Sequence, residues 1–277
     1  MNLAMLNDEL VPAETLDPIY FDRGIYFGDG VYEVMRSYNG KLFAFDDHME
    51  RFARSLAEIR INGIGIDVVA ERVQRAFAAA KLPDAKIYFH VTRGSGPRNH
   101  AWNDEMKPNF FLTISPVGDS SAEKAEGIAV STHPDWRWKR CDIKSLNLLP
   151  NILARQDAAE KGCDEAILVD EAGLITEGAG SGFFAIVNNA LQTAPLTANI
   201  LPSITRKFVV LAAEGAGLKI EENCMTPQQA AAADELFIAV TTKDIVPVVK
   251  FDDTPIGDGK PGPHTRALIE QFRTFTR

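Results

Sequence analysis

The 277-residue sequence has few cysteines and no long apolar run. Cys141, Cys163 and Cys224 are widely spaced, without a C-x-x-C pair or an accompanying histidine pattern, which argues against a disulfide framework or a zinc site. No apolar stretch approaches the roughly 20 residues that a membrane-spanning helix needs. The first ten residues also lack the basic and apolar regions of a secretory signal. These absences predict a cytoplasmic protein with no membrane partner and no metal.

Positive charge is also in short supply. The 29 Lys and Arg residues against 38 Asp and Glu residues give a net charge of -9, which disfavours nonspecific binding to nucleic acid. Hydrophobic residues make up 45% of the sequence, as expected for a globular protein with a substantial core. Against this acidic background "RGSGPRNH", residues 93–100, places two arginines and a histidine between two strand-like runs. Such a loop has the donors to bind an anion.

Hydrophobic spacing in the first half alternates between strand and helix periods. Asn7-Asp8 and Asn39-Gly40 each separate alternating runs and predict β-hairpins, because these turn residues tolerate positive φ. A helix is predicted from Asp46, with Asp46 as its N-cap, and a second helix over 68–81. Hairpins mixed with helices predict an α/β chain of α+β-like character, with an antiparallel sheet rather than a doubly wound one.

Small polar residues between two strand-like runs predict an interdomain linker at 117–126. We therefore expect a smaller N-terminal α/β domain at 1–116 and a larger C-terminal domain at 127–277. Strand and helix patterns alternate in the larger domain. Its expected helices cover 151–162, 203–217 and a final stretch from about His264.

Two residues could carry chemistry on a flat, reactive ligand. Lys144 lies in the apolar stretch "CDIKSLNLL", and burial would lower its pKa as a Schiff-base or general-base lysine requires. Alternatively, its stem packs on apolar neighbours and its ammonium reaches water. Glu177 precedes alternate glycines and could pair with a protonated ring nitrogen. By itself it is more simply interpreted as a solvated glutamate in a glycine-rich turn.

Two segments could hold a phosphate group. Ile204 and Thr205 lie at a predicted helix start, where backbone N–H groups and the helix dipole favour an anion. Thr241 ends a predicted strand and offers a hydroxyl. Taken separately, both segments are explained by capping. Arg51 falls on a predicted helix and is by default a surface residue.

In this order, the stretches resemble the class IV pyridoxal-phosphate aminotransferases, the fold-type-IV enzymes, and among them most closely the bacterial D-amino-acid aminotransferases. The resemblance covers nearly the whole chain, and "CDIKSLNLL" and the Arg98-x-His100 pair are its most specific parts. It implies a larger domain with a pseudo-barrel of mixed strands, pyridoxal 5'-phosphate as cofactor and a homodimer with sites near its interface. It also implies ping-pong transfer of the amino group of D-amino acids to a 2-oxo acid, 2-oxoglutarate or pyruvate.

The resemblance gives each candidate residue a role. Lys144 would hold the cofactor covalently and move the substrate proton, and Glu177 would pair with the ring nitrogen. The residues expected around the ring and the phosphate are Leu201, Arg51, Ile204, Thr205, Thr241 and Arg137. The residues expected to hold the substrate α-carboxylate are Tyr32, Arg98 and His100, and the loop that carries the last two could belong to the other subunit.

Two stretches depart from the family pattern. Residues 179–182 read Ala-Gly-Ser-Gly where the relatives carry serines and an asparagine, and Val240 replaces a hydroxyl residue. Both changes predict lost hydrogen bonds and weaker cofactor binding. The alternatives are a branched-chain L-amino acid aminotransferase, an (R)-amine transaminase, an aminodeoxychorismate lyase, or a noncatalytic anion-binding protein. Arg98 and His100 favour amino acids, because a simple amine has no carboxylate for them to hold.

Overall fold

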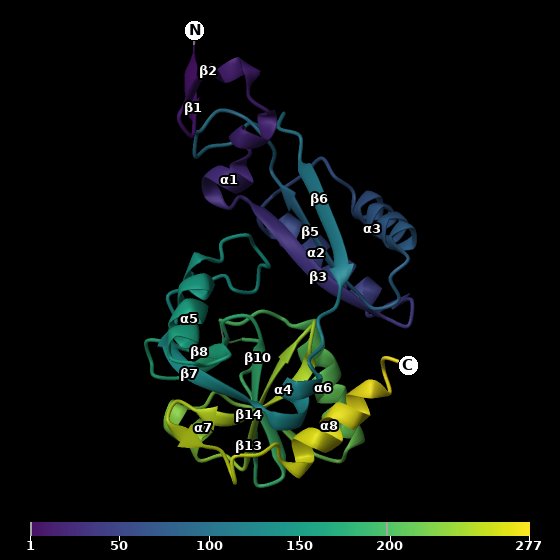
Figure 1. The fold of residues 1–277 in the computed structure, drawn as a ribbon, viewed down its shortest axis with the longest axis vertical. Coiled ribbons are helices and arrows are strands. Elements are labelled where there is room, and N and C mark those ends of the chain that lie inside the picture. Colours follow the sequence, from purple (N-terminus) through teal and green to yellow (C-terminus); the bar gives the residue numbers. More distant parts are fainter. Residues whose placement is uncertain (1, 198) are drawn as a thin grey trace.

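The structure is a computed structural model that describes residues 2–197 and 199–277. A small sheet with two helices and a larger curled sheet with several helices form its two main parts (Figure 1). An N-terminal hairpin of β1 (Leu3–Leu6) and β2 (Glu9–Pro12) projects from the small part. Asn7 has a φ of 53° in its turn, which confirms the first predicted hairpin.

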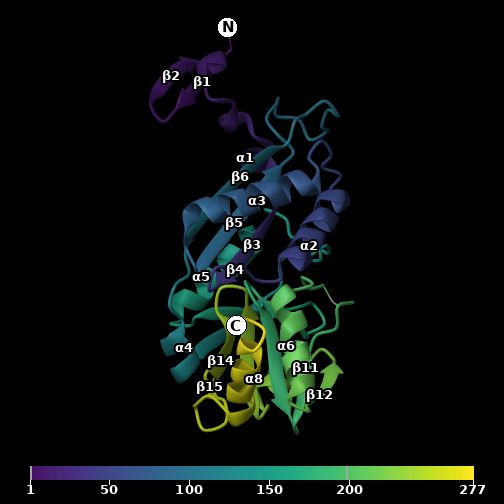
Figure 2. The same ribbon diagram turned by 90° about the vertical axis from the view of Figure 1, so that its right-hand side faces the viewer.

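The small sheet is antiparallel throughout, in the order β4-β3-β5-β6. Its strands are β3 (Gly30–Tyr38), β4 (Lys41–Leu42), β5 (Ala85–Thr92) and β6 (Asn109–Pro116). The second predicted hairpin is confirmed, with Asn39 and Gly40 both at positive φ. One face packs against α2 (Phe45–Glu58) and α3 (Ile66–Ala80), as Figure 2 shows. The opposite face carries Tyr32 and Val34, and both of these residues line a cavity.

The prediction that Asp46 caps α2 is wrong. Ala44, in the left-handed region with a φ of 50°, occupies the N-cap, and no side chain caps the helix. Asp46 lies inside the first turn, where its charge still favours the positive end of the helix dipole. The tight turn that follows the two-residue β4 sets this start.

The larger sheet mixes parallel and antiparallel pairs in the order β12-β11-β10-β13-β14-β7-β8-β9, with β15 beside β14. β9 also contacts β10, so the sheet curls back on itself. This curled mixed sheet confirms the predicted fold class. Its strands are β7 (Ile128–Pro134), β8 (Glu165–Val169), β9 (Ile175–Gly178), β10 (Gly182–Val187), β11 (Ala190–Thr193), β12 (Lys219–Glu222), β13 (Glu235–Val240), β14 (Asp244–Phe251) and β15 (Thr254–Pro255).

Both faces of the central strands are buried. On one face α6 (Ile204–Gly215) and α8 (Pro263–Arg273) cover Phe184 and Phe237, whose rings stack 4.9 Å apart. On the other face Phe183 and Ile238 join a second core. Strands buried on both sides read as continuous apolar runs, which is why "GFFAIV" and "ELFIAV" do not alternate.

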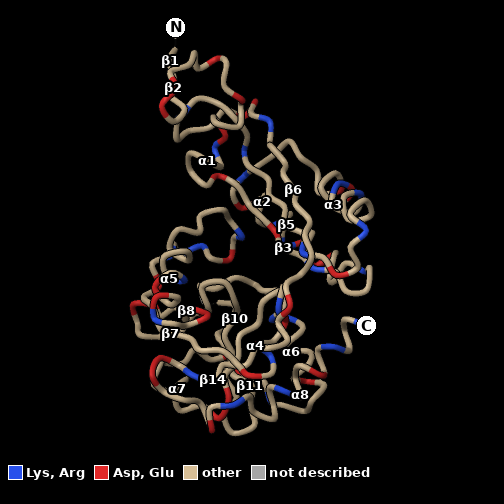
Figure 3. Tube along the Cα trace, in the orientation of Figure 1, with Lys and Arg blue, Asp and Glu red and all other residues tan. Residues whose placement is uncertain are grey.

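The remaining helices are short, apart from α5. They are η1 (Ala13–Thr15), η2 (Pro18–Phe21), α1 (Arg23–Phe27), α4 (Ser121–Glu126), α5 (Leu149–Glu160) and α7 (Pro227–Ala231). None of the helices in the described part of the chain is long and apolar enough to cross a membrane. Acidic and basic residues are interspersed along both parts of the molecule (Figure 3).

The stretch 117–126, predicted as a linker, contains the helix α4. This helix packs against β14, and Lys124 Nζ lies 2.9 Å from Asp244 Oδ2 at the start of that strand. Arg36 and Tyr38 of the small sheet also bind the Asp244 carboxylate. Asp244 is therefore a shared partner of this segment and of the small sheet, and the domain boundaries stay a prediction.

Candidate functional site

A cavity of about 320 Å³ is lined by residues of both sheets. This volume falls within the roughly 300–1,000 Å³ range of small-molecule sites. Its walls come from β3, the segment 137–151, the β9–β10 connection and the β13–β14 turn. Most residues predicted for the site line this cavity: Tyr32, Arg51, Arg137, Lys144, Glu177, Leu201 and Thr241.

Backbone contacts fix Lys144 beside β3. The Tyr32 N–H donates to the Lys144 carbonyl at 2.9 Å, and the Lys144 N–H donates to Ser55 Oγ at 3.3 Å. The neighbouring Ile143 is buried in the core of the small sheet. Lys144 Nζ lies 4.3 Å from the centre of the Tyr32 ring, within range of a cation–π contact. The amine is therefore held at the cavity wall by residues on either side of it.

Glu177 on β9 is almost completely buried at another part of the cavity. Its Oε1 accepts a hydrogen bond from the Leu201 N–H at 3.0 Å and another from Arg137 Nη1. Burial raises the pKa of the Glu177 carboxyl above its usual value, while the charge of Arg137 opposes that rise. A buried carboxylate beside a cation is suited to hold a positively charged ligand atom.

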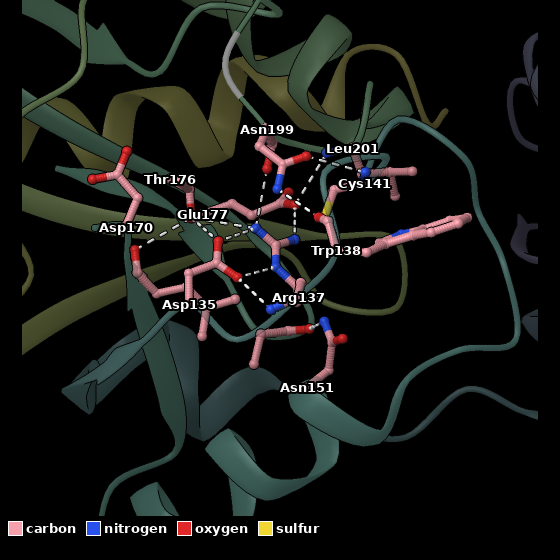
Figure 4. Close-up of polar contacts among 12 residues, drawn as sticks. Asp135, Arg137, Trp138, Cys141, Asn151, Asp170, Thr176, Glu177, Asn199 and Leu201 are labelled. Carbon is pink, nitrogen blue, oxygen red and sulfur yellow. Dashed lines mark hydrogen bonds and ion pairs between the residues drawn. The ribbon is translucent and has the colours of Figure 1, made fainter. Parts of the chain in front are cut away.

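Arg137 contacts Glu177, and not the residues predicted for the phosphate. Its Nε and Nη2 donate to Asp135 at 2.9 and 2.7 Å, and Nη2 also reaches Thr176 Oγ1 and the Asn199 carbonyl (Figure 4). These contacts direct the guanidinium to Asp135 and Glu177, and its predicted place near the phosphate stays a prediction. Asp135 and Thr176 are not among the residues predicted from the sequence, although the Asp-x-Arg spacing was an available signal.

A buried ion-pair cluster holds Arg51 at the cavity. Both Arg51 Nε and Nη2 donate to the Glu33 carboxylate at 2.7 Å, and His48 Nδ1 lies 2.8 Å from the same group. Arg51 Nη1 donates to the Pro202 carbonyl at 3.1 Å. Glu33 alternates with apolar residues on the core face of β3, and a charge buried there needs a partner. That alternation is the sequence signal for Glu33, which was not predicted as a site residue.

The start of α6 lies next to Arg51. The Ser203 side chain caps this helix by accepting from the Arg206 N–H at 3.2 Å. Ile204 and Thr205 form its first turn and are buried, but they are not cavity-lining residues. Only their backbone N–H groups, which a helix start leaves without helical partners, and the Thr205 hydroxyl are suited to an anion there. Thr241 lies in the β13–β14 turn and does line the cavity.

The loop at 93–100 stands apart from Lys144. Arg98 and His100 are exposed, and both contact the Phe27 ring, with centres 5.2 and 5.5 Å away. His100 lines a different hollow beside the loop. Arg93 is buried and donates to Asp29 at 2.8 and 2.9 Å, so it braces the loop. Within one chain the structure does not bring Arg98 and His100 to the cavity, and their predicted role would require a second copy.

The cavity matches the three chemical groups of pyridoxal phosphate. Lys144 offers an amine for an aldehyde, Glu177 a carboxylate for a ring nitrogen, and Arg51 a guanidinium for a phosphate. In residues 179–182, which depart from the family pattern, the Ser181 hydroxyl donates to Glu165 at 2.9 Å. This hydroxyl is therefore engaged by Glu165 and not by a cofactor group. The lost contacts predicted there stay a prediction.

Comparisons with known proteins agree with this fit. The amino-transferase class IV family pattern matches residues 30–251. The chain is 37% identical to a D-alanine aminotransferase of Staphylococcus haemolyticus, over 99% of this chain and 98% of the relative. It is 41% identical to a D-alanine aminotransferase of Bacillus licheniformis, over 88% and 87% of the two chains.

The fold has solved counterparts as well. A branched-chain amino acid aminotransferase of Escherichia coli superimposes with a TM-score of 0.87 at 25% identity, covering 97% of this chain and 92% of the other. Sequence and fold thus identify the same family. The chain belongs to the class IV aminotransferases, enzymes that depend on pyridoxal phosphate.

Proposed function

We propose that the protein transfers the amino group of D-amino acids to a 2-oxo acid, such as 2-oxoglutarate or pyruvate, in a ping-pong cycle. One observation carries the choice of D-amino acids. Proteins named D-alanine aminotransferases match the chain at 37% and 41% identity, whereas the branched-chain enzyme of Escherichia coli shares 25%. We also propose that the protein acts as a cytoplasmic homodimer.

When bound, pyridoxal phosphate supplies an aldehyde that condenses with amines and a ring that withdraws electrons from the substrate. Lys144 Nζ is the group that we assign to the covalent link and to moving the Cα proton, because it lies in the cavity on a fixed backbone. Glu177, assisted by Arg137, would hold a proton at the ring nitrogen through an ion pair. Burial of Glu177 strengthens that attraction.

We assign the remaining predicted residues to binding. Arg51, Thr241 and the N-terminal turn of α6 with Ile204 and Thr205 would hold the phosphate, and Leu201 would contact the ring. The Glu33 carboxylate orients Arg51 for this task. Tyr32, together with Arg98 and His100 from a second copy, would hold the substrate α-carboxylate.

The purified holoenzyme tests this proposal directly. We expect the visible absorption of the bound cofactor to change on addition of D-alanine or D-glutamate, and not with the L-enantiomers. A faster change with branched-chain L-amino acids would contradict the proposal and favour the branched-chain activity. A colourless protein that responds to no amine would favour a noncatalytic anion-binding protein.

In this proposal, Arg137 acts to lower the pKa of Glu177, and this effect can be measured. Arg137→Leu removes the cation that opposes the burial-driven rise in the pKa of Glu177, so the carboxylate is lost at higher pH. We expect kcat to fall roughly 10- to 100-fold, as for other losses of orientation. The acid limb of the pH–rate profile should also move to higher pH. Arg137→Lys should restore part of both.

Arg140 provides the matched control. It is half-exposed and pairs with Glu58 and Asp142, outside the cavity lining. Arg140→Leu should leave kcat and the pH profile unchanged. An Arg137→Leu enzyme with an unshifted acid limb would rule out the proposed effect on Glu177.

A further inference from the structure

We propose that Lys86 is a specificity-determining residue of this reaction, whose ammonium binds the second carboxylate of D-glutamate and 2-oxoglutarate. This inference rests on the proposed function and adds a residue that selects among the substrates of that reaction. Lys86 is outside the set of site residues predicted from the sequence. Its place on β5 and the charges around the cavity carry the inference.

Strand register places Lys86 on the cavity face of the small sheet. Lys86 pairs with Arg36 across β3 and β5, and His90 pairs with Tyr32. Alternation puts Lys86 on the same face as Tyr32 and Val34, while Ile87 faces the core. Positions 32 and 36 on β3 are separated by roughly 14 Å at the spacing of an antiparallel strand. The long lysine side chain shortens that gap, so two carboxylates of one small molecule can reach both ends.

The other cationic side chains lining the cavity already have a partner or a task. Arg51 is paired with Glu33, and Arg137 with Asp135 and Glu177. Lys144 lies over Tyr32 and is assigned to chemistry. The backbone of Lys86 is paired within the sheet, whereas its exposed side chain forms no ion pair or hydrogen bond with any residue in 2–197 or 199–277. Glu177, the one carboxylate among the described lining residues, is held by Arg137.

The neighbours of Lys86 also distinguish it from the phosphate-binding residues. Arg36, directly across the strand pair, is turned to the Thr242 carbonyl and to Asp244, and is not a lining residue. Lys86 is thus the cation that the small sheet presents to the cavity beside Val34. A substrate side chain that ends in a carboxylate gains a charge-assisted contact there. An alanine side chain has no group to make it.

The test is Lys86→Met, which keeps the apolar stem and removes the charge. We expect kcat/KM for D-glutamate and 2-oxoglutarate to fall about tenfold, the effect of one charge-assisted contact. Values for D-alanine and pyruvate should stay within about twofold. Lys86→Arg should retain most of the preference, and Lys161→Met, at an exposed lysine after α5, should change neither substrate.

Binding of unreactive acids separates the subsite from turnover. Glutarate, which has two carboxylates, should bind the Lys86→Met holoenzyme about tenfold more weakly than the wild type, and butyrate equally well. Equal losses for D-glutamate and D-alanine, or unchanged glutarate binding, would overturn the inference. A raised Kd for pyridoxal phosphate, with an unchanged ratio of kcat/KM for D-glutamate to kcat/KM for D-alanine, would also overturn it. Lys86 would then bind the phosphate of the cofactor. If no D-amino acid reacts, the proposed function fails, and glutarate binding still decides the subsite.

Discussion

Lys144→Ala should lower kcat for D-alanine by at least about 10³-fold, within the range that proton transfer by a positioned side chain contributes. Among the lysines of the described chain, only Lys144 and Lys86 line the cavity, and Lys144 is the one held against Tyr32. The loss should come with the disappearance of the visible absorption of the lysine-bound cofactor. Steady-state assays and absorption spectra measure both effects.

Folding of this variant should be nearly unchanged, because the hydrogen bonds of Lys144 with Tyr32 and Ser55 are made by its backbone, and only the contact of its amine with the Tyr32 ring is lost. A small free amine such as methylamine should restore part of the activity, since it can take over the proton transfer. Lys161→Ala is the control and should match the wild type. Turnover by Lys144→Ala within tenfold of the wild-type rate would disprove the assigned role.

Glu33→Gln should destabilise the protein by roughly 3–5 kcal/mol, the cost of removing one partner from a buried ion pair. Glu33 has no exposed surface, and the neutral amide cannot accept from both Arg51 and His48 as the carboxylate does. Arg51 also loses its orientation, so we expect weaker binding of pyridoxal phosphate. Urea denaturation of the apoprotein and cofactor titration test the two effects.

Glu58→Gln is the matched control for Glu33. Glu58 pairs with Arg140 at the surface, where both side chains are more than a third exposed. Exposed pairs of this kind contribute about 0–1 kcal/mol. Equal losses of stability for the two variants would contradict the importance of the buried cluster.

The buried cluster also predicts how stability depends on pH. Burial lowers the pKa of His48, and Glu33 only partly opposes this. Burial acts to raise the pKa of Glu33, but Arg51 and His48 outweigh it and hold that pKa well below its usual range. Both groups therefore bind fewer protons when folded, so their contribution is complete above the usual histidine value of 6.5 and falls as the solution becomes more acidic. In Glu33→Gln, the part of this loss below pH 4.5 should disappear.

Much of the fold could be predicted from local signals. The turns at Asn7 and Asn39, and the runs that become α3, α6 and α8, depend on neighbouring residues alone. The start of α2 could not be predicted in this way. Its N-cap is Ala44 in the left-handed conformation, whereas the sequence pattern indicated Asp46. The helix α4 could not either, since contacts with β14 stabilise six residues of low apolar content.

The candidate site was likewise predictable only in part. Motif order was sufficient to select Lys144, Glu177 and Tyr32, which all line the cavity. The partners of Arg51 and Arg137 could not be predicted, because they come from separate elements that only tertiary packing brings together. Arg98 and His100 were also selected by motif order, but both are exposed. A single chain does not contain the contacts that would define their role.

The attachment of Lys144 to β3 has a consequence for how the enzyme can be recombined. By sequence the 141–148 segment follows β7 and belongs to the second half, yet Ile143 packs in the core of the first half. A chimaera that joins the first half of one relative to the second half of another must therefore match β3 to this segment. Shuffling at residues 117–126 would preserve each sheet and still misplace the amine, so the two halves are expected to evolve as one unit.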